Sequence, residues 1–199
     1  EPFLTVLYVD SIGKDAGEIV GMSPVGVKVT GDKEQIYAMD ADCVIFTPTD
    51  IGDFSSEAEI IRLLESGKNV ITALPYHFPA LRGQAAVDRL EAACKKGGVS
   101  FHASGSDPGF MGERLALTLT GLCSEVKYIT LEEVYDSSLL SKELLSVAGF
   151  GSDPKDVESN QTLAKWADNY LRQVVAHGGH AMGVTFDRIE QKTVTSLAP

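Results

Sequence analysis

The stretch DCVIFTPTDIGDFSSEAEIIRLLESGKNVITAL, residues 42–74, decides the fold class of this chain. Its first part, Cys43 to Thr47, and its last part, Asn69 to Leu74, are short apolar runs rich in branched residues, a pattern typical of buried strands. Between them, residues 57–66 carry apolar side chains at spacings of three and four, which places these on one helix face. A strand, a helix and a strand with short connections predict a right-handed crossover unit in a parallel sheet.

The same alternation continues on both sides of this stretch. Further strands are predicted at residues 4–9, 25–30 and 99–103, and a further helix at residues 84–96. We therefore expect an α/β fold: a doubly wound, Rossmann-type parallel sheet with helices on both faces and with strands 43–47, 69–74 and 99–103 buried on both sides.

After Ala103 the rhythm of the sequence changes. We expect a helix from Asp107-Pro108 to Leu122, a strand at residues 127–135, a long helix at residues 156–176 and an extended piece at residues 184–194. The domain boundary is placed near Ser124. Residues 1–123 would form a dinucleotide-binding domain, and residues 124–199 a smaller, incomplete α+β domain for substrate binding and oligomerisation.

Composition excludes several classes of protein. With 44% hydrophobic and 23% charged residues and a net charge of -11, the chain should be soluble and should repel nucleic acid and anionic membranes. No apolar run approaches the roughly 20 residues needed to cross a bilayer, and no signal-peptide pattern opens the chain, so we expect a cytoplasmic protein. Cys43, Cys94 and Cys123 are expected to be reduced core thiols, and the histidine spacing does not predict a metal site.

In a doubly wound sheet, ligands bind beyond the carboxyl ends of the strands, and these ends are polar here. Asp10 would close a strand and accept hydrogen bonds from the adenosine ribose, which favours NAD over NADP, although nearby Lys14 could tolerate a phosphate. Alternatively, Asp10 starts a turn and residues 47–49 only precede a helix. The cofactor-binding residues predicted on this basis are Asp10, Lys14, Phe46, Thr47, Pro48, Thr49, Thr72, Ala73, Ser104 and Gly105.

The loop from Ser104 to Phe110 has two glycines and a proline and leads into a predicted helix, whose free backbone N–H groups would favour a substrate carboxylate. Alternatively, Asp107 caps that helix. The substrate-binding residues predicted here are Ser106, Asp107, Pro108, Gly109 and Phe110, with His77 after a strand end. Lys142 is a candidate proton donor or a solvated surface residue, and His102 is expected to be a core residue.

Five segments together resemble a known family. GKDAGE (13–18), DCVIFTP (42–48), GKNVIT (67–72), GSDPGF (105–110) and LALTLTG (115–121) are similar to the 2,4-diaminopentanoate dehydrogenase branch of the dihydrodipicolinate-reductase-like proteins. The resemblance implies NAD(P)-linked hydride transfer at a carbon bearing nitrogen, with substrate between two domains. It also implies that residues 4–10 are the second strand of the sheet, so that the first strand and its glycine loop lie upstream of Glu1.

One departure from that family bears on the substrate. Dihydrodipicolinate reductases proper carry a His-His-x-x-x-Lys motif, whereas residues 134–142 read VYDSSLLSK. An amino acid, amine or imine is therefore the favoured substrate of an NAD(P)-dependent oxidoreductase, which would form a homo-oligomer. The alternatives are a catalytically inactive nucleotide-binding or assembly module and a hydroxy acid or semialdehyde dehydrogenase.

Overall fold

The computed structural model describes residues 9–48, 50, 53–192 and 194–196. Three strands form its sheet: β1 (Cys43–Phe46), β2 (Asn69–Thr72) and β3 (Phe101–Ala103). The helical elements, in chain order, are η1 (Val9–Ser11), α1 (Ala16–Ile19), α2 (Lys33–Ala38), α3 (Glu57–Glu65), η2 (Pro79–Arg82), α4 (Gln84–Gly97), η3 (Met111–Leu115), α5 (Ala116–Thr120), η4 (Ser137–Leu139), α6 (Lys142–Val147), α7 (Pro154–Glu158) and α8 (Gln161–Ala181).

The sheet is parallel with the strand order β1-β2-β3, so each strand pairs with its neighbour in sequence. Its register places Phe46 beside Thr72 and Thr72 beside Ala103, which aligns the carboxyl ends of the strands. The strands predicted at residues 43–47, 69–74 and 99–103 are thus confirmed, as are the helices predicted at 57–66 and 84–96. The sheet and its helices form a Rossmann-like α/β fragment.

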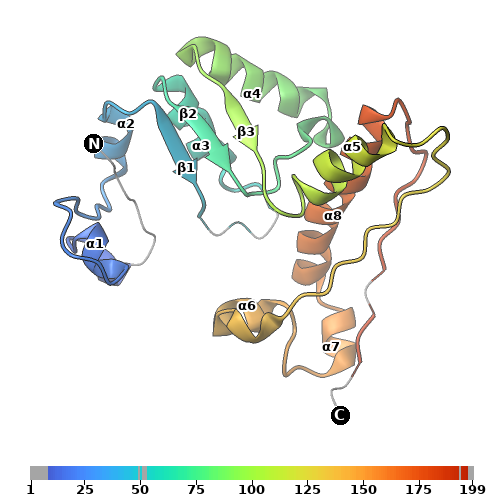
Figure 1. Cartoon of the computed structure of the whole chain (residues 1–199). Coiled ribbons are helices and arrows are strands. Elements are labelled where there is room, and N and C mark those ends of the chain that lie inside the picture. The colour runs from blue at the N-terminus through green and yellow to red at the C-terminus, as the bar shows by residue number, and fades with distance from the viewer. Residues whose placement is uncertain (1–8, 49, 51–52, 193, 197–199) are drawn as a thin grey trace.

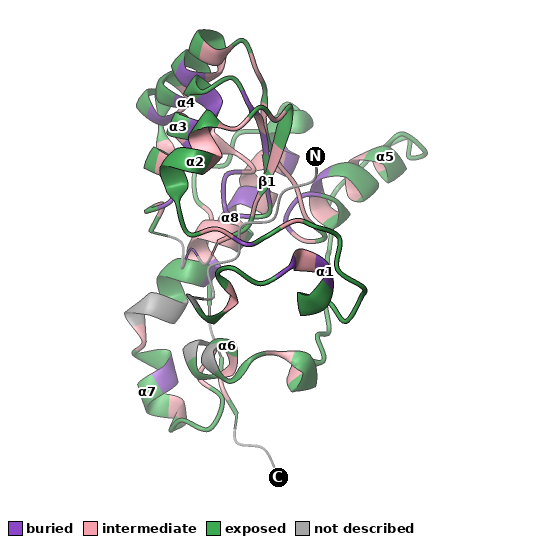
Figure 2. Cartoon of the chain, turned by 90° about the vertical axis from the view of Figure 1, so that its left-hand side faces the viewer, coloured by how far each residue is buried: buried purple, intermediate pink, exposed green. Residues whose placement is uncertain are grey.

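The hydrophobic core lies between the sheet and the helix pair α3 and α4 (Figures 1 and 2). Ile60 and Leu64 of α3 are fully buried, Leu90 of α4 is nearly so, and Val70 of β2 meets them from the sheet. Each such side chain stabilises the fold by about 1.5–3 kcal/mol on burial. The amphipathic periodicity of residues 57–66 is therefore satisfied by packing on one face of the sheet.

The opposite face of the sheet differs from the prediction. Ile45 is 77% exposed and Ile71 is 42% exposed, and His102, which pairs with Ile71 in the register, is exposed as well. Since side chains alternate between the two faces of a strand, burial of Val44 and Val70 against α3 and α4 sends these three outward. The expectation that the strands are buried on both faces is therefore wrong for the described residues, and His102 is not a core residue.

The segment before β1 contains a loop that hydrogen bonds to Asp15 hold together. The Asp15 carboxylate accepts hydrogen bonds from the backbone N–H groups of Gly17, Val25 and Gly26, at 2.8 to 2.9 Å, and these bonds lower its pKa. The strand predicted at residues 25–30 is reduced to one bridge, between Asp15 and Lys28. Of the strand predicted at residues 4–9, all but Val9 lies outside the described residues, and Val9 belongs to the 3₁₀ turn η1.

Beyond β3, the described chain contains helices and irregular segments. The strand predicted at residues 127–135 is not found: these residues are exposed, Val134 at 92%, and no strand of the described chain lies beside them to complete a ladder. The long helix predicted at 156–176 is divided into α7 and α8, and residues 184–192 and 194–196 form neither helix nor strand. The boundary near Ser124 and the homo-oligomer stay predictions.

The cysteines also differ from expectation. Cys43 and Cys123 are exposed, and Cys94 is partly buried, with its thiol pKa raised by that burial. Cys43 begins β1 on the open face of the sheet, so its apolar sequence context does not give it a core position. Among the helices of the described residues, none is both long enough and apolar enough to span a bilayer.

Replacing Thr72 by valine tests the alignment of the strand ends. The side chain is 1% exposed; its hydroxyl donates to the carbonyl oxygen of Phe46 at 2.6 Å and accepts from the N–H of Leu74 at 3.1 Å. Thr72→Val keeps the shape but leaves both groups unpaired, so we expect unfolding in urea to become easier by about 1–3 kcal/mol. The exposed Thr185→Val serves as control; equal stability of the two variants would contradict the assignment.

Candidate functional site

The polar residues that follow the three strands meet at one edge of the sheet. Thr72 joins β2 to β1 through the carbonyl of Phe46, and its own carbonyl accepts a hydrogen bond from the N–H of Ser104 at 2.9 Å. Thr47 and Ala73 are exposed along this edge. Three of the segments predicted to bind a cofactor therefore lie side by side.

The remaining predicted cofactor residues are placed differently. Pro48, Ser104 and Gly105 are half-buried at the same edge, whereas Thr49 lies outside the described residues. Asp10 and Lys14 are exposed in the segment that leads into α1, which is separated from the strand ends in Figure 1. The structure thus assembles the strand-end part of the predicted site and leaves Asp10 and Lys14 apart from it.

A pocket of about 210 Å³ opens next to this edge, at the end of β3. Four segments enclose it: the end of β3, the loop that follows β2, the loop before η3, and α8. The lining residues are Tyr76, His77, Pro79, Phe101, His102, Ala103, Gly109, Arg114 and His177. Of the residues predicted to bind substrate, His77 and Gly109 line the pocket.

His77 is the most strongly perturbed group of the pocket. Both of its ring nitrogens are buried without a hydrogen-bond partner among the described residues. The pKa of His77 is lowered to about 4, mainly by burial and in addition by the neighbouring His177 and His102. At neutral pH the imidazole is therefore uncharged, with one N–H donor and one nitrogen acceptor that no described residue uses.

Helix α8 reaches the pocket because Gln173 ties it to the loop after β2. The Gln173 amide donates to the carbonyl of Pro75 at 2.6 Å and accepts from the N–H of Phe78 at 2.8 Å. One helical turn further along, the ring of His177 stacks on Phe78, with 5.3 Å between centroids and 9° between planes. These contacts fix His177 and the segment that carries His77 in one arrangement.

The loop before η3 is tight, and its geometry corrects one prediction. Gly109 has a φ of 123°, and a Cβ there would lie 2.3 Å from the backbone nitrogen of Gly105, so the position requires glycine. The N–H groups of Phe110 and Met111 both donate to the carbonyl of Ser106. These backbone donors are used inside the loop and are not free for a substrate carboxylate.

Two carboxyl groups lie beneath this loop. Glu113 is 3% exposed and accepts a hydrogen bond from the N–H of Gly109 at 2.9 Å. Asp107 does not cap the helix, which begins at Met111, and its Oδ1 is buried without a partner among the described residues. Burial raises the pKa of Asp107, and the charges of Glu133 and Glu113 raise it further.

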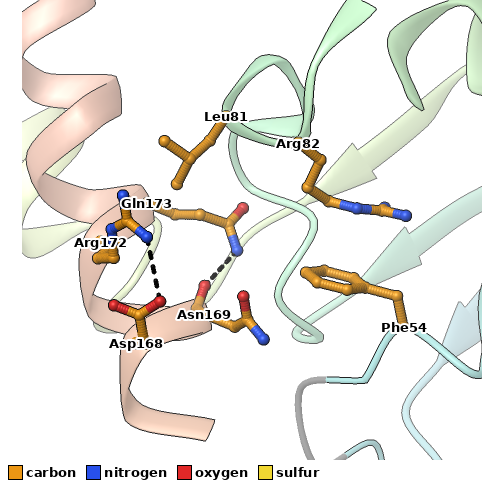
Figure 3. A pocket seen from close by; sticks show the side chains of 7 residues that line it. All are labelled: Phe54, Leu81, Arg82, Asp168, Asn169, Arg172 and Gln173. Atoms are coloured by element: carbon orange, nitrogen blue, oxygen red, sulfur yellow. Dashed lines mark hydrogen bonds and ion pairs between the residues drawn. The ribbon is translucent and has the colours of Figure 1, made fainter. Parts of the chain in front are cut away.

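A second, smaller pocket of about 80 Å³ lies between α8 and the segment around η2 (Figure 3). Its arginines have acidic partners: Arg172 pairs with Asp168 at 3.1 Å, and Arg82 pairs with Glu57 at 2.5 Å while lying over the ring of Phe54. Because these charges are already paired, we interpret this pocket as a gap at the contact between α8 and the segment around η2.

Lys142, the predicted proton donor, is not brought to the pocket. It is exposed at the start of α6, which lies well apart from the sheet in Figure 1. Conversely, sequence reasoning missed Arg114, His177 and Tyr76 as pocket residues. A sequence signal for Arg114 would have been a charged residue among the mostly apolar positions 110–122. However, the residues that line the pocket are up to about 100 positions apart in the sequence, so their proximity could not be predicted.

In the described chain, no group of histidine, cysteine, aspartate and glutamate could hold a metal ion.

Comparison with known proteins agrees with this fold. No protein-family model matches the chain. It is 28% identical over 186 residues to the amine dehydrogenase of Streptomyces virginiae, covering 90% of this chain and 51% of that protein. The structure of the amine dehydrogenase from Mycobacterium smegmatis matches with a TM-score of 0.72 and 16% identity, covering 94% of this chain and 56% of that one.

The structural match identifies the fold of the chain, and the sequence match identifies an enzyme that it resembles. The chain shares the fold of the Mycobacterium smegmatis enzyme and is similar in sequence to the Streptomyces virginiae enzyme, both called amine dehydrogenases. It spans about half the length of each. The narrower resemblance to 2,4-diaminopentanoate dehydrogenases stays a prediction.

The environment of His77 can be tested by titration. Because its folded-state pKa of about 4 lies below the ordinary value of 6.5, the unfolded chain takes up a proton first as the pH falls. The resulting stability is complete above pH 6.5 and is lost as the pH falls towards 4. We expect the imidazole C2–H resonance to titrate near pH 4, and thermal stability to fall more between pH 7 and 4.5 in the wild type than in His77→Gln. Exposed His180→Gln is the control, and a titration midpoint near 6.5 would contradict the burial.

Proposed function

We propose that this chain is part of an NAD(P)-dependent oxidoreductase that acts on an amino acid, amine or imine. The observation that carries the proposal is the shared edge formed by Thr47, Thr72 and Ser104, with the pocket of His77 directly beside it. Ligands of open parallel sheets bind at such edges. The likeness to the Streptomyces virginiae amine dehydrogenase supports a nitrogen-bearing substrate.

The residues at the edge suit the nicotinamide half of the cofactor. When bound, the nicotinamide would supply or accept the hydride. Thr47 and Ala73 are exposed there, and Pro48 gives a rigid surface against which a flat ring can lie. In this proposal, Phe46, Ser104 and Gly105 complete the wall, and Asp10 with Lys14 would approach the ribose only if their segment lies closer to the edge in the complex.

The pocket suits a small amine. A neutral His77 can accept a hydrogen bond from an amine N–H, because its lone pair is not used within the described chain. The loop from Ser106 to Phe110 bounds the pocket through Gly109, and Glu113 holds that glycine in place. A substrate in this pocket would be partly shielded from bulk water, with the strand edge beside it for the cofactor.

One observation favours a second candidate, a nucleotide-binding or assembly module without catalysis. Lys142 is exposed and remote from the pocket, so the proton donor suggested by sequence has no place at the site. Proton transfer would then fall to one of the titratable side chains that line the pocket, which are Tyr76, His77, His102 and His177. Turnover distinguishes the two candidates.

The direct test uses the full-length protein with NADH, NADPH and their oxidised forms. We expect nicotinamide fluorescence to report cofactor binding below millimolar concentration, and absorbance at the nicotinamide band to report turnover with a panel of amines and amino acids. Alcohols and hydroxy acids serve as the comparison panel. Tight binding without turnover would favour the module, and turnover of hydroxy acids alone would favour an alcohol-type dehydrogenase.

The proposed contact of Asp10 with the ribose predicts a change of cofactor preference. Asp10→Ser removes the charge that would repel a 2'-phosphate, so the ratio of kcat/KM with NADPH to that with NADH should rise about tenfold, the factor for about 1.4 kcal/mol. Exposed Asp40→Ser changes net charge equally and should leave the ratio unchanged. An unchanged ratio in Asp10→Ser would remove Asp10 from the cofactor site.

A further inference from the structure

Arg114 differs from the other arginines of this acidic chain. Of the six arginines, five pair with a carboxylate: Arg62 with Glu34, Arg82 and Arg89 with Glu57, Arg172 with Asp168, and Arg188 with Glu190. Within the described residues, no carboxylate lies within ion-pair distance of the Arg114 guanidinium. In a chain with 28 acidic residues, an arginine without an acidic partner is available for an external anion.

The guanidinium of Arg114 contacts a histidine at the pocket. Its Nη2 lies 3.0 Å from Nε2 of His102, and both residues line the pocket. Because arginine has no acceptor, the His102 Nε2 is the acceptor in this hydrogen bond. This contact orients one edge of the guanidinium without neutralising its charge, and leaves its other N–H donors for a ligand.

The other groups near the pocket do not compete for this role. The backbone N–H groups of Gly109, Phe110 and Met111 are used within the loop, so they cannot hold an anion. Glu113, which precedes Arg114 in sequence, is turned inward to Gly109. Arg114, an exposed residue, is thus the arginine that lines the cavity in the described chain, together with the uncharged His77.

We propose that Arg114 binds the carboxylate of the substrate, which would make the preferred substrate an amino acid and not a simple amine. The inference rests on the proposed function for the amine of the substrate, whereas the carboxylate of the substrate is inferred from the pocket alone. A planar guanidinium matches a carboxylate with two parallel hydrogen bonds. With the carboxylate on Arg114, the amine lies towards His77 and the strand edge, within the dimensions of a pocket of about 210 Å³.

The first experiment measures anion binding without cofactor, by calorimetric titration of the full-length protein with propionate, propylammonium and inorganic phosphate. We expect propionate to bind the wild type and to bind Arg114→Gln at least about tenfold more weakly, the loss expected for hydrogen bonds to a charged group. Arg188→Gln, which removes an exposed arginine of the C-terminal segment, is the matched control and should bind as the wild type does. Equal binding by Arg114→Gln, or binding of phosphate but not propionate, would overturn the proposal.

The second experiment compares 2-aminobutyrate with 2-aminobutane, in which a methyl group replaces the carboxylate. We expect Arg114→Gln to lower kcat/KM for 2-aminobutyrate about tenfold, mainly through KM, and to leave 2-aminobutane unaffected; Arg114→Lys, which keeps the charge and loses the planar fork, should fall between. Preference for 2-aminobutane in the wild type would refute the carboxylate subsite and leave the amine oxidoreductase standing. Arg114-dependent propionate binding without turnover of any amine would support the carboxylate subsite and refute the amine oxidoreductase.

Discussion

The buried amide of Gln173 is the contact on which the arrangement of the site depends. It is 2% exposed, and it bridges α8 to Pro75 and Phe78, almost a hundred residues earlier in the chain. An amide whose donors and acceptor are all used in the interior is geometrically demanding, because any shift of α8 would leave a buried N–H or carbonyl unpaired. The positions of His77 and His177 both follow from this bridge.

A second contact sets how closely the η3 segment approaches α8. A Cβ on Gly112 would lie 2.3 Å from Cγ1 of Val174, so the two backbones can meet only because Gly112 has no side chain. The core between α3, α4 and the sheet is apolar and non-directional, so it supplies stability more than precision. Position at the site comes instead from a few polar or steric contacts, those of Thr72, Gln173 and Gly112.

This division explains which parts of the structure the sequence could predict. Strands 43–46, 69–72 and 101–103 and helices α3 and α4 follow from local periodicity, because each buries one face against its sequence neighbours. Residues 127–135 show a similar apolar pattern but lack a neighbouring strand in the described chain, and a strand is defined by its partner as much as by its own residues.

The candidate site divides in the same way. Its strand-end residues were predictable, because parallel strands of known order must place their carboxyl ends at one edge. Arg114, His177 and the exposed position of His102 were not, since they depend on contacts between segments that are far apart in sequence, such as Gln173 with Pro75. The sequence predicts burial for Ile45 and Cys43, which are exposed, for a related reason. An apolar run predicts that side chains alternate between the two faces of a strand, but not whether a helix covers each face.

Glu113 and Arg114 are adjacent residues of the π-helical turn η3, but they make different contacts. The N–H groups of Met111 and Leu115 bond to the carbonyls of Ser106 and Phe110, five residues earlier in each case, which widens the turn relative to an α-helix. Adjacent side chains of any helix point in different directions, and the widened turn sets which position meets which neighbour. Glu113 turns under the loop to hold Gly109, and Arg114 turns to the cavity beside His102. A regular α-helix from Pro108 would shift this register. The widened turn therefore sets the register in which a loop-ordering carboxylate and a pocket-lining guanidinium take adjacent positions.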